Sequence, residues 1–165
     1  MSNYEENRHF FLSQYFRDQY DASMATLPNM TTGVTINRVE VWVTNKSGTT
    51  SNTRNLIALT DLGEDRHISN TTLWSGSGTL IPSNESNNEY STLVNSHSAA
   101  RDIDQASTEL EGIGNFSGGV DYEKLSSARL LNSSEYTVNT SLGYISLRTT
   151  LQTDQVLAVA YEYTY

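Results

Sequence analysis

The sequence predicts a mixed α+β fold that is mainly β, with an antiparallel, β-sandwich-like sheet packed against an N-terminal amphipathic helix and short helices. Three patterns predict it: helical spacing of apolar residues near the start, alternation in several later segments, and turn-forming residues between them. The 165 residues can bury a core, and the absence of cysteine excludes disulfides and thiolate zinc sites. We expect a single soluble domain over residues 1–165, excised from a longer chain.

Residues 1–28 are predicted to be a helical segment, with the helix itself over residues 4–26. Its apolar and aromatic positions recur every three or four residues, as one helical face requires: Leu12, Phe16, Tyr20, Met24 and Leu27. Ser2 or Asn3 would cap the helix and Pro28 would stop it. We expect the aromatic face to pack on a sheet.

Residues 35–62 are predicted to form a β-hairpin. In "TINRVEVWVTN", residues 35–45, three valines alternate with Arg38, Glu40 and Trp42. The segment "NKSGTTSNT" has the composition of a turn, and "RNLIALTDL", residues 54–62, supplies the second strand.

The rest of the chain divides into two parts. Residues 63–119 are expected to be loop-rich and partly helical, with a short helix at 89–95 and another within 96–114. Residues 120–165 are expected to hold a short helix in "DYEKLSSARLL", a hairpin in "SEYTVNTSLGYISL" and the terminal strand "VLAVAYEYTY". The apolar stripe of that last strand is predicted to pack in the core.

Charge and hydropathy exclude several partners. The formal net charge is −9, from 19 acidic and 10 basic residues, so the chain lacks the basic footprint that nucleic acid requires. The same acidity disfavours anionic lipid headgroups. No stretch approaches the length of a membrane-spanning helix, so we expect no direct membrane insertion of this segment.

The sequence does not predict an enzyme, because no catalytic constellation is present. The best metal candidate is His67 in "DLGEDRH", preceded by Asp61, Glu64 and Asp65, but acidic residues at a strand exit are ordinary turn formers. Nucleophile elbows, phosphate loops and dinucleotide fingerprints are missing from the sequence. We therefore expect no catalytic residues, no cofactor and no metal.

Two tryptophans make a binding module harder to dismiss. Trp42 shares a strand face with Arg38 and Glu40, and a planar aromatic beside two charges suits a carbohydrate contact. Trp74 is a second candidate. Packing of Trp42 beneath the N-terminal helix, with the charges at its margin, is the interpretation we favour.

Two blocks of the sequence resemble a known family. They are "INRVEVWVTNKSGTTSNTRNLIALTDLGE", residues 36–64, and "VDYEKLSSARLLNSSEYTVNTSLGYISLRTTLQTDQVLAVAYEYTY", residues 120–165. Both resemble the SprA/Sov family of Bacteroidota gliding-motility and type IX secretion proteins. The segment "FFLSQYFRDQYD" is similar to the family as well, whereas residues 68–119 carry no resemblance.

The resemblance implies a role in protein export. Family members are very long outer-membrane barrels that form a translocon pore, so this chain would be one soluble domain between barrel segments. The implied partners are other segments of the same chain, secretion-system subunits and cargo proteins. Barrels have long extracellular loops and short periplasmic turns, so we expect the domain outside the outer membrane rather than in the periplasm.

Two functional hypotheses follow. One is a non-catalytic structural and interaction domain of the translocon. The alternative is a carbohydrate-binding or adhesive β-sandwich module of a bacterial surface protein, which requires an exposed Trp42 or Trp74 beside polar groups.

Overall fold

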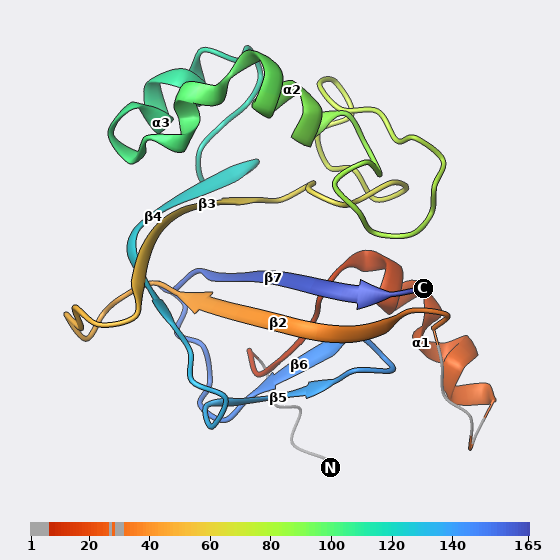
Figure 1. The fold of residues 1–165 in the computed structure, drawn as a ribbon. Coiled ribbons are helices and arrows are strands. Elements are labelled where there is room, and N and C mark those ends of the chain that lie inside the picture. Colours follow the sequence, from red (N-terminus) through yellow and green to blue (C-terminus); the bar gives the residue numbers. More distant parts are fainter. Residues whose placement is uncertain (1–6, 27, 29–31) are drawn as a thin grey trace. The chain divides into compact units, whose positions relative to one another are not determined.

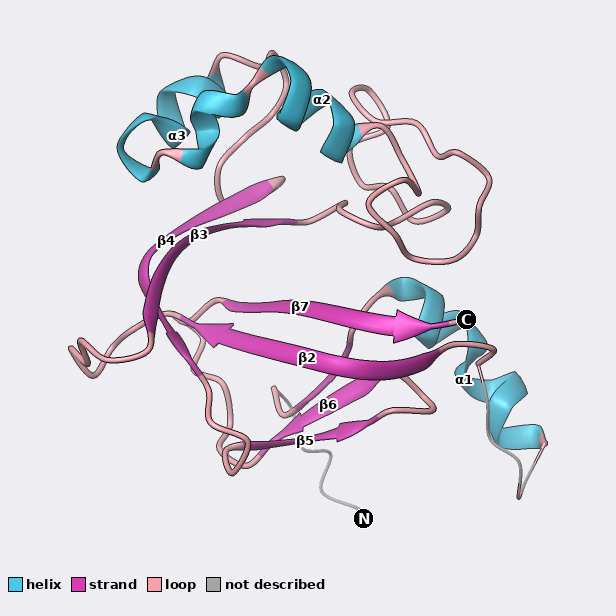
Figure 2. Cartoon of the chain, viewed as in Figure 1, coloured by secondary structure: helices cyan, strands magenta, loops and turns pink. Residues whose placement is uncertain are grey.

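The computed structural model describes residues 7–26, 28 and 32–165 and confirms the mixed, mainly β fold. Strands make up 30% and helices 21% of the structure, and the strands form antiparallel sheets (Figures 1 and 2). The chain forms two compact units. The first comprises Met1–Asn52 and Arg129–Tyr165, and the second is Thr53–Ala128.

The first unit contains a three-stranded antiparallel sheet in the order β1-β6-β5. Its strands are β1 (His9–Phe11), β5 (Tyr136–Asn139) and β6 (Tyr144–Leu147). β5 and β6 are the hairpin that alternation predicted, and Ile145 of β6 is fully buried.

β2 (Thr35–Val43) and β7 (Leu157–Thr164) form the second layer of this unit (Figure 1). They pair antiparallel along their whole length, from Thr35 opposite Thr164 to Val43 opposite Leu157. Tyr136 Oη of β5 donates a hydrogen bond to the Val39 carbonyl of β2 over 3.3 Å. The two sheets of the unit therefore meet in a sandwich-like arrangement.

α1 (Gln14–Ala25) is shorter than predicted, and the expectation of helix over residues 9–11 was wrong. Those residues form β1 because their backbone pairs with β6. Ser13 occupies the position before the helix, whereas the predicted caps Ser2 and Asn3 lie outside the described residues. Phe16, from the predicted apolar stripe, is fully buried.

The predicted hairpin over residues 35–62 was also wrong. β3 (Thr53–Leu59) has β4 (Tyr122–Leu130) as its neighbour, and β2 pairs instead with β7 and with the last two residues of β4. The turn composition of residues 45–53 predicted a reversal, but local composition does not specify which strand becomes the partner.

β4 itself replaces the short helix predicted in "DYEKLSSARLL". Burial recurs at Tyr122, Leu125 and Ala128, a spacing of three that imitates one face of a helix. Within the strand, Ser127 has a positive φ of 52°, which interrupts the regular alternation of side chains. Pairing with β3 stabilises the strand over the helix that periodicity favoured.

The helices of the second unit are α2 (Glu89–Ser96), η1 (Ser98–Arg101) and α3 (Ile103–Glu111). Asp102 separates the last two, because its backbone is extended and its carboxylate caps α3 by accepting from the Asp104 N–H. The unit's core cluster is Trp74, Leu110, Phe116 and Tyr122. Within the described ranges, no helix is both long and apolar enough to cross a membrane.

Candidate functional site

The predicted site on β2 separates into an exposed charged part and a buried aromatic part. Arg38 Nη2 lies 2.5 Å from Glu40 Oε1, and Arg38 Nη1 lies 3.9 Å from Glu162 Oε1 on β7. Trp42 is only 7% exposed. The charges of Arg38 and Glu40 therefore pair on the surface, while the indole has no open face to offer a sugar ring.

Trp74 is a core residue of the second unit. It is 3% exposed, and its ring meets Phe116 edge to face with the ring centroids 5.5 Å apart. Phe116 in turn stacks on Tyr122 at 5.2 Å. Trp74 belongs to the second unit, whereas Arg38, Glu40 and Trp42 belong to the first.

The acidic residues of "DLGEDRH" organise loops. Asp61 is buried, and its two carboxylate oxygens accept from the Ser69 N–H at 2.7 Å and the Asn70 N–H at 2.9 Å. Asp65 Oδ1 accepts from the Gly78 N–H at 2.7 Å. No group of three or more His, Cys, Asp or Glu residues that could hold a metal ion occurs in the described part of the chain.

Glu89 is the most unusual ionisable residue of the second unit, and the sequence did not reveal it. It is fully buried, and neither carboxylate oxygen has a hydrogen-bond partner among the residues that the structure describes. Burial, reinforced by the charges of Asp61 and Asp121, raises its pKa to about 8. Glu89 therefore carries a proton at neutral pH, although a glutamate in the first turn of a helix is ordinarily ionised and solvated.

Asp121, one of the two charges acting on Glu89, is itself held by hydrogen bonds. Its carboxylate accepts from the Ser117 N–H at 2.7 Å and from Asn70 Nδ2 at 2.9 Å. Asn87 Nδ2 donates to the carbonyls of Asp61 and Glu64, both at 2.8 Å. These bonds tie together the loops around Glu89 and keep its neighbouring carboxylates in place.

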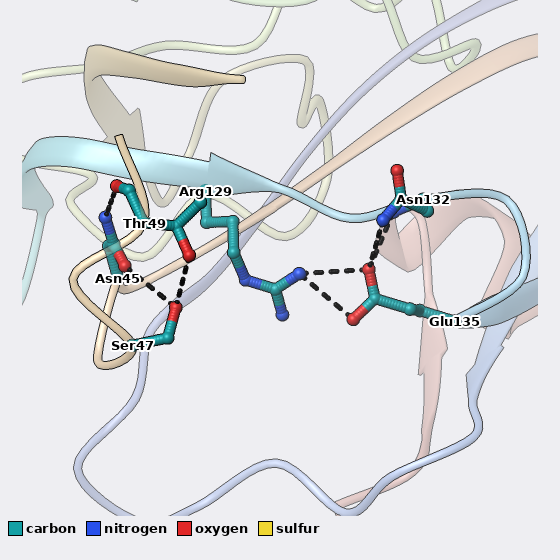
Figure 3. Close-up of polar contacts among 6 residues, drawn as sticks. All are labelled: Asn45, Ser47, Thr49, Arg129, Asn132 and Glu135. Atoms are coloured by element: carbon teal, nitrogen blue, oxygen red, sulfur yellow. Dashed lines mark hydrogen bonds and ion pairs between the residues drawn. The ribbon is translucent and has the colours of Figure 1, made fainter. Parts of the chain in front are cut away.

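A polar cluster in the first unit fixes the chain after β4 (Figure 3). Arg129 Nη1 donates to both carboxylate oxygens of Glu135, at 3.0 and 2.9 Å, and the Asn132 N–H donates to the same carboxylate at 2.8 Å. The hydrogen bond from Arg129 lowers the pKa of Glu135. In the same view, Asn45 Nδ2 donates to the Thr49 carbonyl at 2.7 Å. Both groups of contacts close turns, which is a structural role.

Neither a known protein-family model nor a curated protein matches the chain. The site must therefore be judged on geometry. Trp42 and Trp74, the aromatic residues of the predicted site, are buried. The polar residues with the most hydrogen bonds, such as Asp61 and Glu135, stabilise loops and turns.

Proposed function

We propose that the chain is a non-catalytic structural and interaction domain of an outer-membrane translocon for type IX protein secretion and gliding motility. One observation carries the proposal: the two blocks that resemble the SprA/Sov family pair with each other in space. Residues 36–64 hold most of β2 and all of β3, whereas residues 120–165 hold β4 to β7.

Both strands of the first block have neighbours in the second block. β2 pairs with β7 and with the end of β4, and β3 neighbours β4. A strand framework needs both partners of every pair, so a likeness that covers both partners of these pairs is what a shared framework would produce. Residues 68–119, which carry no resemblance, contribute loops and the three helical segments.

The proposal includes partners and a location. The domain would contact other segments of the same barrel-forming chain, secretion-system subunits and cargo proteins, on the extracellular side of the outer membrane. Its net charge of −9 supports protein partners over nucleic acid and anionic lipid headgroups.

The carbohydrate-binding or adhesive alternative has no specific observation in its favour. It depends on Trp42 or Trp74 as a stacking platform, and these side chains are 7% and 3% exposed. A glycan array provides a direct check, because sugar binding that Trp42→Phe or Trp74→Phe weakens would restore this alternative.

The secretion role can be tested in the bacterium that carries the gene. An in-frame deletion of the encoded residues should abolish release of a type IX cargo reporter and gliding, and reintroduction of the segment should restore both. Fractionation should place an epitope-tagged protein in the outer membrane, and protease added to intact cells should cleave it. Normal secretion after the deletion, with the truncated product present, would contradict the proposal.

A further inference from the structure

The second unit contains an open cleft between β3 and its helices, with a volume of about 300 Å³. Apolar side chains line it from several elements, including Ile57 of β3, Leu93 of α2 and Ile103 of α3. Figure 2 shows these helices covering one face of β3 and β4. Small-molecule sites in proteins are typically concave, of about this volume or larger, and mostly apolar with a few polar groups.

The charge of the cleft differs from that of the chain. The whole sequence has 19 acidic and 10 basic residues, yet the twelve lining residues include Arg101 and His97 and no aspartate or glutamate. Glu109 lies outside the lining and is bound to His97, with Nδ1 and Oε1 3.0 Å apart.

Arg101 is exposed, and none of the described carboxylates forms an ion pair with it. Its neighbour Asp102 is committed to the helix cap, where its two oxygens accept from the Asp104 N–H at 3.0 Å and from Gln105 Nε2 at 3.1 Å. The guanidinium at the edge of an apolar cleft therefore remains available to an anion.

We propose that this cleft binds a small amphipathic carboxylate of the medium-chain fatty-acid class. Its volume of about 300 Å³ is large enough for octanoate, which has ten non-hydrogen atoms. The alkyl chain lies against Ile57 and Leu93, and the carboxylate accepts hydrogen bonds from the Arg101 guanidinium, whose fork matches two carboxylate oxygens. This proposal is independent of the secretion role, because it concerns binding by the purified chain.

The test is isothermal titration of the purified chain with sodium octanoate and, as a neutral match, octan-1-ol. Octanoate should bind saturably and at least about tenfold more tightly than octanol. Arg101→Gln should weaken octanoate binding about tenfold and leave octanol binding unchanged. Arg66→Gln is the matched control, because Arg66 is another exposed arginine of the same unit and does not line the cleft.

A second variant locates the ligand. Ala100→Phe places a ring in the cleft and should abolish octanoate binding, with the unfolding temperature confirming a folded chain. If that variant does not fold, chemical-shift changes in the wild-type chain provide the same information, and they should centre on residues 93–103. The proposal is overturned if octanoate does not saturate, if octanol binds equally well, if Arg101→Gln matches wild type, or if the shifts lie elsewhere.

Discussion

The backbone of Gly143 lies directly against the ring of Phe16. A Cβ added to this glycine would be 2.1 Å from Phe16 Cδ1, and the glycine has a positive φ of 65°. The Gly143 carbonyl also accepts a hydrogen bond from the Leu12 N–H at 2.9 Å. One residue in the β5–β6 turn thus fixes both the turn and the approach to α1.

Gly143→Ala should destabilise the first unit by about 2–4 kcal/mol, because left-handed backbone strain adds to overpacking against a buried ring. Urea unfolding followed by Trp42 fluorescence in a Trp74→Phe background measures this loss. Gly48→Ala is the matched control, because its φ is 66° and a Cβ there would meet nothing within 4 Å. We expect the control to lose only about 1 kcal/mol. Equal losses in both variants would show that the Phe16 contact contributes nothing.

The second unit should lose stability as pH rises. The ordinary pKa of a glutamate is 4.5, whereas the pKa of Glu89 in the folded chain is about 8, so folding favours its protonated form. Its contribution is complete below pH 4.5 and is lost as pH rises through 8, at up to about 1.4 kcal/mol per pH unit. Urea unfolding followed by Trp74 fluorescence in a Trp42→Phe background, between pH 5 and 8, measures the slope.

Glu89→Gln is neutral at every pH and should flatten that slope. Glu85→Gln, at an exposed position of the same unit, should keep the wild-type slope. If wild type and Glu89→Gln had the same slope, Glu89 would not be the group that titrates.

Glu135 should act in the opposite direction. The Arg129 contact lowers its folded pKa, so its contribution to stability is complete above the unfolded pKa and is lost as pH falls through the folded value. Because both side chains are partly exposed, Glu135→Gln should cost only about 1 kcal/mol at pH 7. The loss of unfolding free energy caused by Glu135→Gln should be smaller at pH 3 than at pH 7, as measured by urea unfolding at both pH values.

Asp154→Asn is the control variant. It removes an exposed ion pair with Lys46 and should leave the free energy of unfolding unchanged.

Both tryptophans should resist quenching in the folded chain. Trp42 and Trp74 are almost fully covered, so acrylamide should quench the native protein weakly and the urea-unfolded protein strongly. Trp42→Phe and Trp74→Phe assign the signal to each unit. Strong quenching of either indole in the folded state would contradict its burial and favour a surface role.

Alternation along the chain predicted several strands correctly because their side chains sample two different environments. β7 is the clearest case, because half-buried and exposed residues alternate along it from Val159 to Thr164, whereas β2 ends in three consecutive buried residues. β4 was predicted as a helix because Tyr122, Leu125 and Leu130 can share one helical face, and in the strand the positive φ of Ser127 breaks the alternation that would have indicated β structure. The local sequence pattern could not predict which strands pair with one another. The residues between β2 and β3 have the composition of a turn whether or not these two strands pair.

The site was harder to predict than the fold. Trp42 could stack against a ligand only if its ring were exposed, and it is instead part of the core. The exposure of a side chain depends on packing partners that are distant in the sequence. The raised pKa of Glu89 could not be predicted from the sequence for the same reason. It depends on burial and on two carboxylates, Asp61 and Asp121, that the fold brings near Glu89.

The pairing of β2 with β7 implies an order of folding. The second unit, Thr53–Ala128, is continuous in sequence and can build its core as soon as it has been synthesised. β2 is synthesised earlier but cannot pair with β7 until much later, because the chain between them includes the whole second unit. During synthesis, most of β2 would thus lack its partner strand until β7 has been made, and would be exposed to mispairing until then.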